Sequence, residues 1–239
     1  MKHIPGLQLA DCLFQALLPA YCRLCGTRIG RGPGLCMDCH DELPWSQHVC
    51  RQCGRPLTGA PGGGPCGRCQ REPPVFTATT AALRYQPPVD YLIQRLKFSG
   101  ELALVPLLTT LLFEALGGHE PPLPELLLPV PLHRSRLRER GFNQATEIAR
   151  ALGRRLGVPV DRHRCRRTRR TGTQSLVPVG SRRHNVRNAF AINGTPGAQH
   201  VAIIDDVMTS GHTVNELARA LKRAGVEIIE VWVVARAGH

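Results

Sequence analysis

Four C-x-x-C pairs stand near the start of the chain, at a spacing that suits metal binding. Two thiolates separated by two residues can hold one metal ion from a tight turn, and two such turns complete a tetrahedral site. Eight cysteines therefore predict two zinc ions, which are structural because protein atoms fill every ligand position. The eight predicted ligands are Cys22, Cys25, Cys36, Cys39, Cys50, Cys53, Cys66 and Cys69.

The cysteine-rich segment is an internal repeat, which bears on how the pairs combine. CRLCGTRIG at 22–30 aligns with CRQCGRPLTG at 50–59, and Gly26 and Gly54 stand where each turn needs a permissive backbone. If each repeat is one unit, the first two pairs share one ion and the last two share the other. An interleaved pairing is the alternative. Disulfides would need an oxidising compartment and a secretion signal, neither of which is apparent, and a redox C-x-x-C usually occurs alone.

A second candidate site is the stretch VAIIDDVMTSGHT at 201–213. An apolar run ends in Asp205 and Asp206, and a hydroxyl-rich loop follows before the next helical pattern. Backbone N–H groups at a helix N-terminus, helped by hydroxyl groups, form a site for a phosphate, while two carboxylates can hold ribose hydroxyls or hydrated Mg²⁺. The alternative is an ordinary strand-to-helix turn with a threonine cap and solvated aspartates. The loop is not a P-loop, because the lysine and spacing of that motif are missing.

The elements around this stretch alternate between strands and helices. This alternation predicts an α/β domain with a mainly parallel sheet flanked by helices, in which ligands bind at the carboxyl ends of the strands. We expect strands at 77–85, 126–131, 201–205 and 228–235, short strands near 162–168 and 188–192, and helices at 89–97, 102–116, 142–156 and 213–224.

Three segments divide the 239 residues. We expect an amphipathic helix at 1–20, a double zinc ribbon at 21–74 and the α/β domain at 75–239. Cys12 and Cys165 have no partner at metal spacing, so we interpret them as packing residues. No stretch is long and apolar enough to cross a membrane, and the cysteine usage favours a reducing compartment, so we expect a cytoplasmic protein.

The positive charge of the chain is concentrated in one segment. Between Arg134 and Arg187 there are sixteen arginines, no lysine and three acids, and sixteen minus three equals the net charge of +13 of the whole chain. An anionic partner is therefore expected, either a phosphate-rich small molecule or a nucleic acid.

Taken together, these motifs resemble a known family. VAIIDDVMTSGHT resembles the phosphoribosyl pyrophosphate (PRPP) binding motif of type I phosphoribosyltransferases. The whole chain resembles the ComF family, in which a double zinc ribbon precedes a phosphoribosyltransferase-like domain. Besides the cysteine pairs, the resemblance rests on LKFSG (96–100), PVPLHRSRLRERGFNQ (129–144) and RTRRTGTQSL (167–176). Ser210 departs from the family, which commonly has a threonine there, but it keeps the hydroxyl.

The resemblance implies a role for each matched segment. Asp205 and Asp206 would be the catalytic acids and would bind the ribose hydroxyls of PRPP with Mg²⁺ nearby. The loop of Thr209, Ser210, Gly211, His212 and Thr213 would bind the 5′-phosphate. The turn from Pro131 to Arg134 would face the pyrophosphate. A loop at 167–185 would close over the site. The remaining basic and polar residues of the matched motifs are Arg140, Asn143, Gln144, Arg167, Arg169, Arg170 and Arg182.

Two functions follow from this resemblance and stay open at the level of sequence. The first is a phosphoribosyltransferase-type protein that binds PRPP and acts in competence and DNA uptake, with its acceptor and its turnover open. The second is a single-stranded nucleic-acid-binding module that uses the basic segment on the same fold, although aromatic residues for base stacking are nearly absent there.

Overall fold

The computed structural model describes residues 20–30, 34–57, 64–117, 122–168 and 189–238 of the chain. It forms two compact units, Met1–Leu43 and Pro44–His239, each of which contains one cysteine cluster. Residues 1–19, which include Cys12 and all but the last residue of the expected amphipathic helix, lie outside the described residues. Arg169, Arg170 and Arg182 also lie outside them. Within the described part of the chain, no helix is long and apolar enough to cross a membrane.

The first unit is a small cysteine-bearing fold. Strands β1 (Ala20–Tyr21) and β2 (Arg28–Ile29) pair in antiparallel fashion, and helix α2 (Met37–Asp41) follows. The amide of Gly26 donates to the carbonyl of Cys22 at 3.0 Å, which closes the turn between the first two cysteines. Gly26 has φ +74°, so the expected need for a permissive backbone is confirmed.

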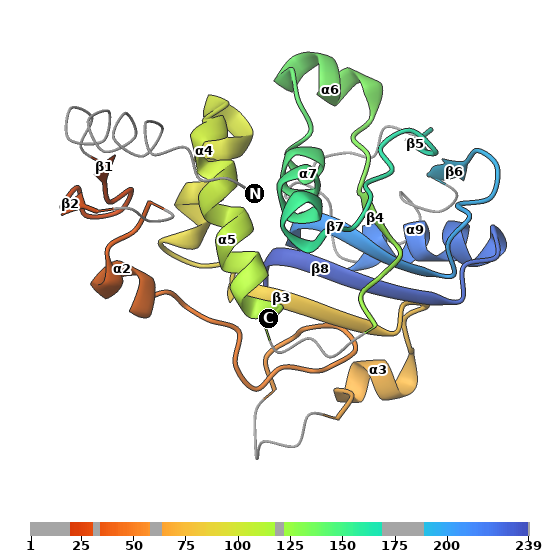
Figure 1. Cartoon of the computed structure of the whole chain (residues 1–239). Helices are drawn as coiled ribbons and strands as arrows, with labels where there is room; N and C mark the ends of the chain where they lie inside the picture. Colours follow the sequence, from red (N-terminus) through yellow and green to blue (C-terminus); the bar gives the residue numbers. More distant parts are fainter. Residues whose placement is uncertain (1–19, 31–33, 58–63, 118–121, 169–188, 239) are drawn as a thin grey trace, which may run out of the picture. The chain divides into compact units, whose positions relative to one another are not determined.

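A four-stranded parallel sheet forms the centre of the second unit, as predicted (Figure 1). The strand order is β3 (Ala78–Arg84), β8 (Ile228–Arg236), β7 (His200–Met208), β4 (Leu126–Pro129). Ile203 in β7 stands opposite Leu128 on one side and Val231 on the other. Strands β4 and β7 contain continuous runs of buried apolar residues, which are typical of parallel strands that are covered on both faces.

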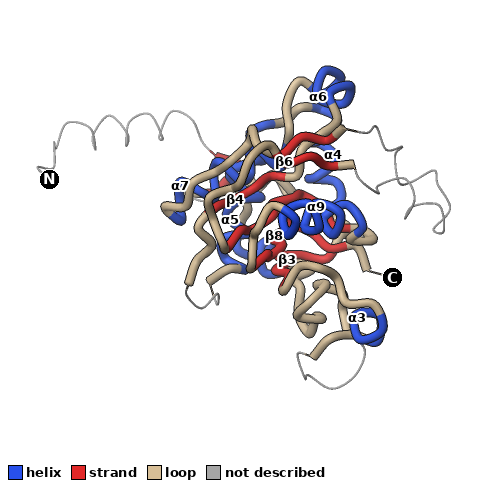
Figure 2. The backbone as a smooth tube through the Cα atoms, turned by 90° about the vertical axis from the view of Figure 1, so that its right-hand side faces the viewer, coloured by secondary structure: helices blue, strands red, loops and turns tan. Residues whose placement is uncertain are grey.

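Helices cover both faces of this sheet (Figure 2). Helix α5 (Val105–Ala115) and helix α7 (Gln144–Leu156) pack against one face, and α9 (His212–Arg223) packs against the other. On the α9 face, Val214, Leu217 and Leu221 are buried against strand residues in one apolar cluster. The remaining helices of this unit are α3 (Gly67–Arg71), α4 (Val89–Ser99), the short 3-10 helix η1 (Leu102–Leu104) and α6 (Arg134–Arg140).

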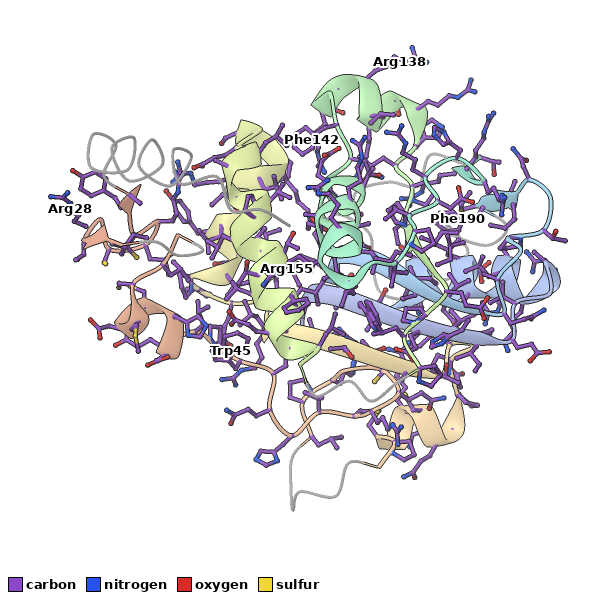
Figure 3. The ribbon with its side chains drawn as sticks, viewed as in Figure 1. Arg28, Trp45, Arg138, Phe142, Arg155 and Phe190 are labelled. Atoms are coloured by element: carbon purple, nitrogen blue, oxygen red, sulfur yellow. The ribbon has the colours of Figure 1, made fainter. Side chains whose placement is uncertain are left out.

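Helix α7 illustrates why the sequence folds as it does. Ile148, Ala149 and Leu152 fall on one face at helical spacing and are fully buried. In the last turn of α7, the guanidinium of Arg155 lies 4.1 Å from the centroid of the Phe113 ring, so it joins α7 to α5 (Figure 3).

Three details differ from the elements that the sequence predicts. Helix α6 occupies 134–140, for which no helix was expected. Strand β7 runs to Met208 instead of ending at Asp205, because it continues to pair with β8 as far as Arg236. The short strands β5 (Cys165–Arg167) and β6 (Phe190–Ile192) occur where expected, but they form a separate antiparallel pair. Cys165 is 5% exposed, which agrees with a packing role.

The second cysteine cluster is fastened directly to the central sheet. Thr79 of β3 donates from its amide to the carbonyl of Arg51 at 2.9 Å and from its hydroxyl to the carbonyl of Gln52 at 2.8 Å. Gly54 lies against the same threonine with φ +66°, and a Cβ atom there would stand 2.9 Å from the Thr79 Cγ2 atom. This packing makes the second ribbon part of the same unit as the sheet.

Candidate functional site

The eight predicted metal ligands form two groups of four, with the sulfur atoms of each group within 4.8 Å of one another. Cys22, Cys25, Cys36 and Cys39 make one group, and Cys50, Cys53, Cys66 and Cys69 make the other. The consecutive pairing expected from the repeat is therefore confirmed over the interleaved one.

The spacing of the sulfur atoms fits zinc. A tetrahedron with Zn–S bonds of about 2.3 Å places its sulfur atoms roughly 3.8 Å apart. The Sγ atoms of Cys25 and Cys36 are 3.6 Å apart, and those of Cys53 and Cys66 are 3.7 Å apart. Burial alone would raise the pKa of the Cys22 thiol, but hydrogen bonds from the backbone of Cys25, Cys36 and Leu24 lower it to about 6. This favours the thiolate form of Cys22, whereas the hydrogen bond with Cys36 raises the pKa of the Cys39 thiol above its ordinary value.

Asp205 and Asp206 lie near the carboxyl end of β7 and are held by their own backbone. One carboxylate oxygen of Asp205 accepts from the amide of Asp206 at 3.0 Å, and one of Asp206 accepts from the amide of Val207 at 2.8 Å. Asp206 is only 2% exposed. A buried carboxylate needs a compensating charge, because leaving water costs several kcal/mol.

Lys97, near the C-terminus of α4, supplies that charge. Its Nζ atom lies 2.8 Å from the Asp206 Oδ2 atom. Burial alone would lower the pKa of Lys97, but the charge of Asp206 and the hydrogen bond to it raise the pKa above its ordinary value. Lys97 is therefore held as an ammonium group at neutral pH.

Asp205 loses its proton less readily than an ordinary aspartate. Desolvation by the surrounding protein, followed by the negative charge of Asp206, raises the pKa of Asp205 well above its ordinary value, while Lys97 opposes the shift. Two adjacent carboxylates with one cation do not carry two full negative charges easily. The site is therefore ready to accept a cationic or hydroxyl-bearing ligand that relieves this repulsion.

The loop after β7 leads into the N-terminus of α9. Gly211 is the residue before the helix and has φ +79°, a left-handed conformation that favours glycine. The side chains of this loop alternate between two cavities. Thr209 and Thr213 line the cavity that contains Asp205 and Asp206, whereas Ser210 and His212 line another.

The first of these, which we call the acid cavity, has a volume of about 240 Å³. Its lining includes two acids and several basic side chains, which make it a polar site at the carboxyl ends of the strands, where the fold places ligands. Its polar lining consists of Tyr85, Lys97, Arg136, Gln144, Arg167, Asp205, Asp206, Thr209 and Thr213.

Comparison with known proteins decides the identification. Residues 13–70 match the double zinc ribbon domain, and residues 137–239 match the phosphoribosyl transferase domain. The chain is 35% identical to DNA utilization protein YhgH of Escherichia coli O157:H7, over 92% of this chain and 98% of that protein. The chain belongs to the ComF family.

Other ComF relatives are similar over most of their length. Competence protein F of Haemophilus influenzae is 35% identical over 85% of this chain and 91% of that protein. Competence protein ComFC of Bacillus subtilis is 25% identical over 80% of this chain and 79% of that protein. The double zinc ribbon and the phosphoribosyltransferase-type α/β domain that the sequence predicts are thus confirmed.

The ComF motif R-G-F-N-Q at 140–144 acquires a structural explanation. Gly141 ends α6 with φ +81°, and the Asn143 side chain accepts from the amide of Ala145 at the start of α7. The Asn143 amide group also donates to the carbonyl of Val130 at 3.0 Å, at the end of β4. Arg140 donates to the Gln144 side chain at 2.7 Å, and Gln144 lines the acid cavity. The motif joins two helices and fastens them to the sheet beside the acids.

The residues singled out from the sequence are not all brought into the acid cavity. Asp205, Asp206, Thr209, Gly211, Thr213, Gln144 and Arg167 line it, but Pro131, Arg134, Arg140, Asn143, Ser210 and His212 do not. Lys97, Tyr85 and Arg136 were not singled out, although they line it. Two of them lie in motifs that the sequence analysis quoted, Lys97 in LKFSG (96–100) and Arg136 in PVPLHRSRLRERGFNQ (129–144), and a lysine in an unexplained motif is a candidate partner for a buried acid.

Proposed function

We propose that this protein binds PRPP with Mg²⁺ in the acid cavity and acts in DNA utilisation. The observation that carries the proposal is the meeting of Asp205 and Asp206 with Thr209, Gly211 and Thr213 of the following loop at one cavity, in a chain with a phosphoribosyl transferase domain. The names of its relatives, which refer to DNA utilisation and competence, support the wider role.

Each part of PRPP has a matching group in the acid cavity. Thr209, Thr213 and the backbone amides at the start of α9 suit the 5′-phosphate. Asp205 and Asp206 suit the ribose hydroxyls, which donate hydrogen bonds to carboxylates. Arg136 and Arg167 are the basic side chains of the lining that suit the pyrophosphate.

The same arrangement suits displacement of pyrophosphate from the ribose. Breaking the bond at C1 builds positive charge on the sugar and negative charge on the leaving group. Mg²⁺, when bound, neutralises part of the pyrophosphate charge. Asp206 would stabilise the developing cation or take a proton from the nucleophile, and the arginines would stabilise the departing group.

Calorimetric titration of PRPP tests the proposal. Magnesium is to be omitted in the control rather than chelated, because a chelator would also remove zinc. We expect binding that needs Mg²⁺ and is lost in the Asp205→Asn/Asp206→Asn variant. The matched control is Glu147→Gln, which neutralises an acid of α7 that pairs with Arg150 and does not line the cavity. Binding without Mg²⁺, or binding that survives in the double variant, would contradict the proposal.

A second candidate function is binding of single-stranded nucleic acid. Arg162, Arg164 and Arg166 are exposed at and just before β5, and the relatives are named for DNA utilisation and competence. Contacts to a phosphate backbone predict affinity that falls log-linearly with salt concentration. Fluorescence anisotropy with an oligothymidine tests this, since Arg162→Gln/Arg166→Gln should weaken binding and reduce the salt slope. An unchanged slope would exclude these arginines as the contact surface.

A further inference from the structure

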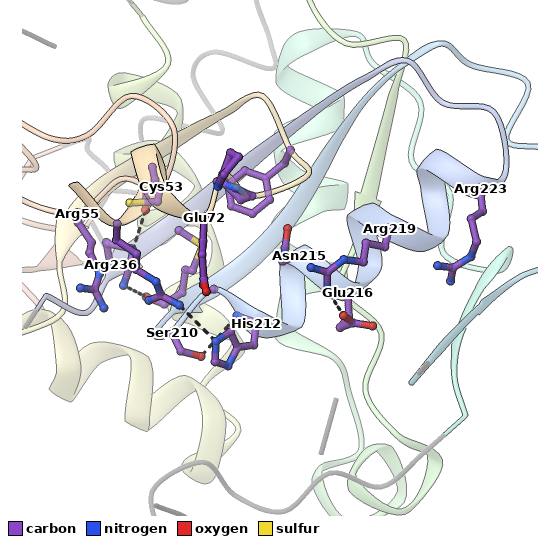
Figure 4. A pocket seen from close by; sticks show the side chains of 17 residues that line it. Cys53, Arg55, Glu72, Ser210, His212, Asn215, Glu216, Arg219, Arg223 and Arg236 are labelled. Atoms are coloured by element: carbon purple, nitrogen blue, oxygen red, sulfur yellow. Dashed lines mark hydrogen bonds and ion pairs between the residues drawn. The ribbon is translucent and has the colours of Figure 1, made fainter. Parts of the chain in front are cut away.

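The loop after β7 faces a second cavity as well as the acid cavity. This second cavity has a volume of about 690 Å³, and its lining comes from the loop, from α9, from the end of β8 and from the second zinc ribbon, residues 50–69 (Figure 4). Ser210 and His212 line it, whereas Thr209 and Thr213 line the acid cavity. The loop that we assign to the 5′-phosphate of PRPP therefore also borders the second zinc ribbon.

Arg236, the last residue of β8, joins the ribbon to the start of the loop. Its side chain is only 1% exposed. The Nε atom donates to the carbonyl of Cys53 at 2.9 Å, and the Nη1 atom donates to the carbonyls of Met208, at 3.0 Å, and Thr209 (Figure 4). Burial lowers the pKa of Arg236 to about 10, so the guanidinium still carries its charge at neutral pH. One charged group thus holds a predicted zinc ligand and the residues where β7 leads into the loop.

Arg68 joins the ribbon to the other end of the loop. It belongs to α3, between the predicted ligands Cys66 and Cys69, and its Nη2 atom lies 3.3 Å from the Nε2 atom of His212. A guanidinium group can only donate, so the imidazole nitrogen is the acceptor. His212 is the first residue of α9, so this contact acts on the helix N-terminus whose amides face the loop.

A third hydrogen bond continues the connection into the first turn of α9. The side-chain oxygen of Asn215 accepts from the amide of Val75 at 2.8 Å. Val75 lies in the segment that leads from the ribbon into β3, and Thr79 of β3 donates to two carbonyls of the ribbon. The residues before, within and after the loop are therefore each tied to the ribbon or to the segment that follows it.

The ribbon can hold these groups in place only while it is itself folded. So short a segment has little apolar core of its own, and in such segments bound zinc supplies much of the folding free energy. The carbonyl that Arg236 binds belongs to a predicted ligand, and Arg68 lies between two others. The positions of both contacts therefore depend on the metal site.

We propose that Arg236 and Arg68 are positioning residues that fasten the loop after β7 to the second zinc ribbon, so that the geometry of this loop depends on zinc in that ribbon. The consequence for PRPP rests on the proposed function, whereas the fastening itself does not. We expect zinc in the first ribbon to have no such effect, because that ribbon belongs to the other compact unit.

Hydrogen exchange of the full chain, followed by mass spectrometry without any ligand, tests the dependence on zinc. Cys53→Ser should lose the second zinc ion and speed the exchange of the amides at 209–213 by about tenfold or more. Cys25→Ser is the matched control, because it should lose the first zinc ion and leave this exchange unchanged. Strand β4, at the edge of the sheet opposite β3, is the internal reference. Unchanged exchange at 209–213 in Cys53→Ser, or an equal effect of Cys25→Ser, would overturn the proposal.

Arg68→Met tests the connection with all eight cysteines in place, so it gives the answer if Cys53→Ser raises exchange throughout the sheet. It should speed exchange at 209–213 about fivefold, because one charge-assisted hydrogen bond is lost. Arg71→Met makes the same change at an exposed position of the same helix that does not line the cavity, and we expect an effect of less than about twofold. Elemental analysis should find about two zinc ions in both variants.

A double-mutant cycle shows whether Arg68 acts through His212. In a His212→Phe background, Arg68→Met should have no further effect on the loop, because its partner is already gone. A general loss of stability would instead add to the effect of His212→Phe. An effect of Arg68→Met no larger than that of Arg71→Met, or one that persists in full in the His212→Phe background, would overturn the role of Arg68.

Titration with PRPP and Mg²⁺ distinguishes this inference from the proposed function. If the wild type binds PRPP, Arg68→Met should weaken binding about fivefold and Arg71→Met less than about twofold. If the wild type does not bind PRPP while exchange at 209–213 still depends on the second zinc ion and on Arg68, the proposed function fails and the fastening stands. Equal PRPP affinity of the wild type and Cys53→Ser would overturn the dependence of the loop on zinc.

Discussion

The ion pair between Lys97 and Asp206 allows the most detailed prediction. The two charged atoms are 2.8 Å apart, and the side chains are 20% and 3% exposed. Removing one partner of a fully buried pair costs about 3–5 kcal/mol, whereas an exposed pair contributes about 0–1 kcal/mol. Lys97 is partly exposed and lines the acid cavity, so we expect Lys97→Met to lower the free energy of unfolding by about 2–3 kcal/mol.

Urea unfolding of the zinc-loaded protein at pH 7.5, followed by circular dichroism, measures this effect. The cost comes from an uncompensated carboxylate, so neutralising that carboxylate should remove most of it. The double variant Lys97→Met/Asp206→Asn should therefore regain more than half of the lost stability. Arg95→Met is the matched control on the same helix, because Arg95 pairs with Glu101 at 2.7 Å but is 39% exposed. We expect it to cost less than about 1 kcal/mol.

Two results would refute the reasoning. If Lys97→Met costs no more than Arg95→Met, the pair is not screened from water as its burial indicates. If Asp206→Asn does not rescue the Lys97 variant, the loss is due to the packing of the lysine and not to its charge.

Three other predictions concern the acids and the cysteine clusters. The raised folded-state pKa of Asp205 means that the fold holds this proton more tightly than the unfolded chain does. The group therefore stabilises the fold at acidic pH and loses that contribution as pH rises through the folded pKa. Asp205→Asn should therefore be more stable than wild type at pH 7.5 in thermal unfolding, with the difference shrinking towards pH 4, and a variant less stable at neutral pH would contradict this. Gly54→Ala should lower the free energy of unfolding by about 2 kcal/mol, because it places a Cβ atom at positive φ against Thr79. An unchanged free energy in urea unfolding would show that this contact relaxes. Elemental analysis should find about two zinc ions per chain in wild type and about one in Cys25→Ser or Cys53→Ser, since the two clusters are separate, and loss of both ions from either variant would indicate a shared site.

Much of the fold was accessible from the sequence because its signals are local. The repeat predicted which cysteine pairs combine, and apolar runs predicted the strands of the sheet. The need for a permissive backbone at Gly26 and Gly54 was also expected, and both residues adopt positive φ in the tight turns of the cysteine pairs.

The features that could not be predicted from the sequence depend on helix capping or on contacts between residues far apart in the chain. Helix α6 has the sequence RSRLRER, whose single apolar residue, Leu137, is 42% exposed, so no periodicity announces it. It is bounded instead by the His133 side chain, which accepts from the amide of Ser135 at 3.3 Å, and by Gly141.

The partners of the buried charges were equally hidden. Lys97 and Asp206 meet only because α4 ends beside the carboxyl end of β7. Arg236 is the last residue of β8, one position beyond the strand expected at 228–235, and it donates to the carbonyls of Cys53 and Met208. Such pairs are set by the tertiary structure, and a local pattern carries no information about them.

A crystal structure of the protein with PRPP and Mg²⁺ would test the central proposal most directly. The account predicts the ribose within hydrogen-bond distance of Asp205 and Asp206, and the 5′-phosphate against the amides of the 209–213 loop. Density for PRPP elsewhere, or an acid cavity that stays free of PRPP at saturating concentration, would contradict it.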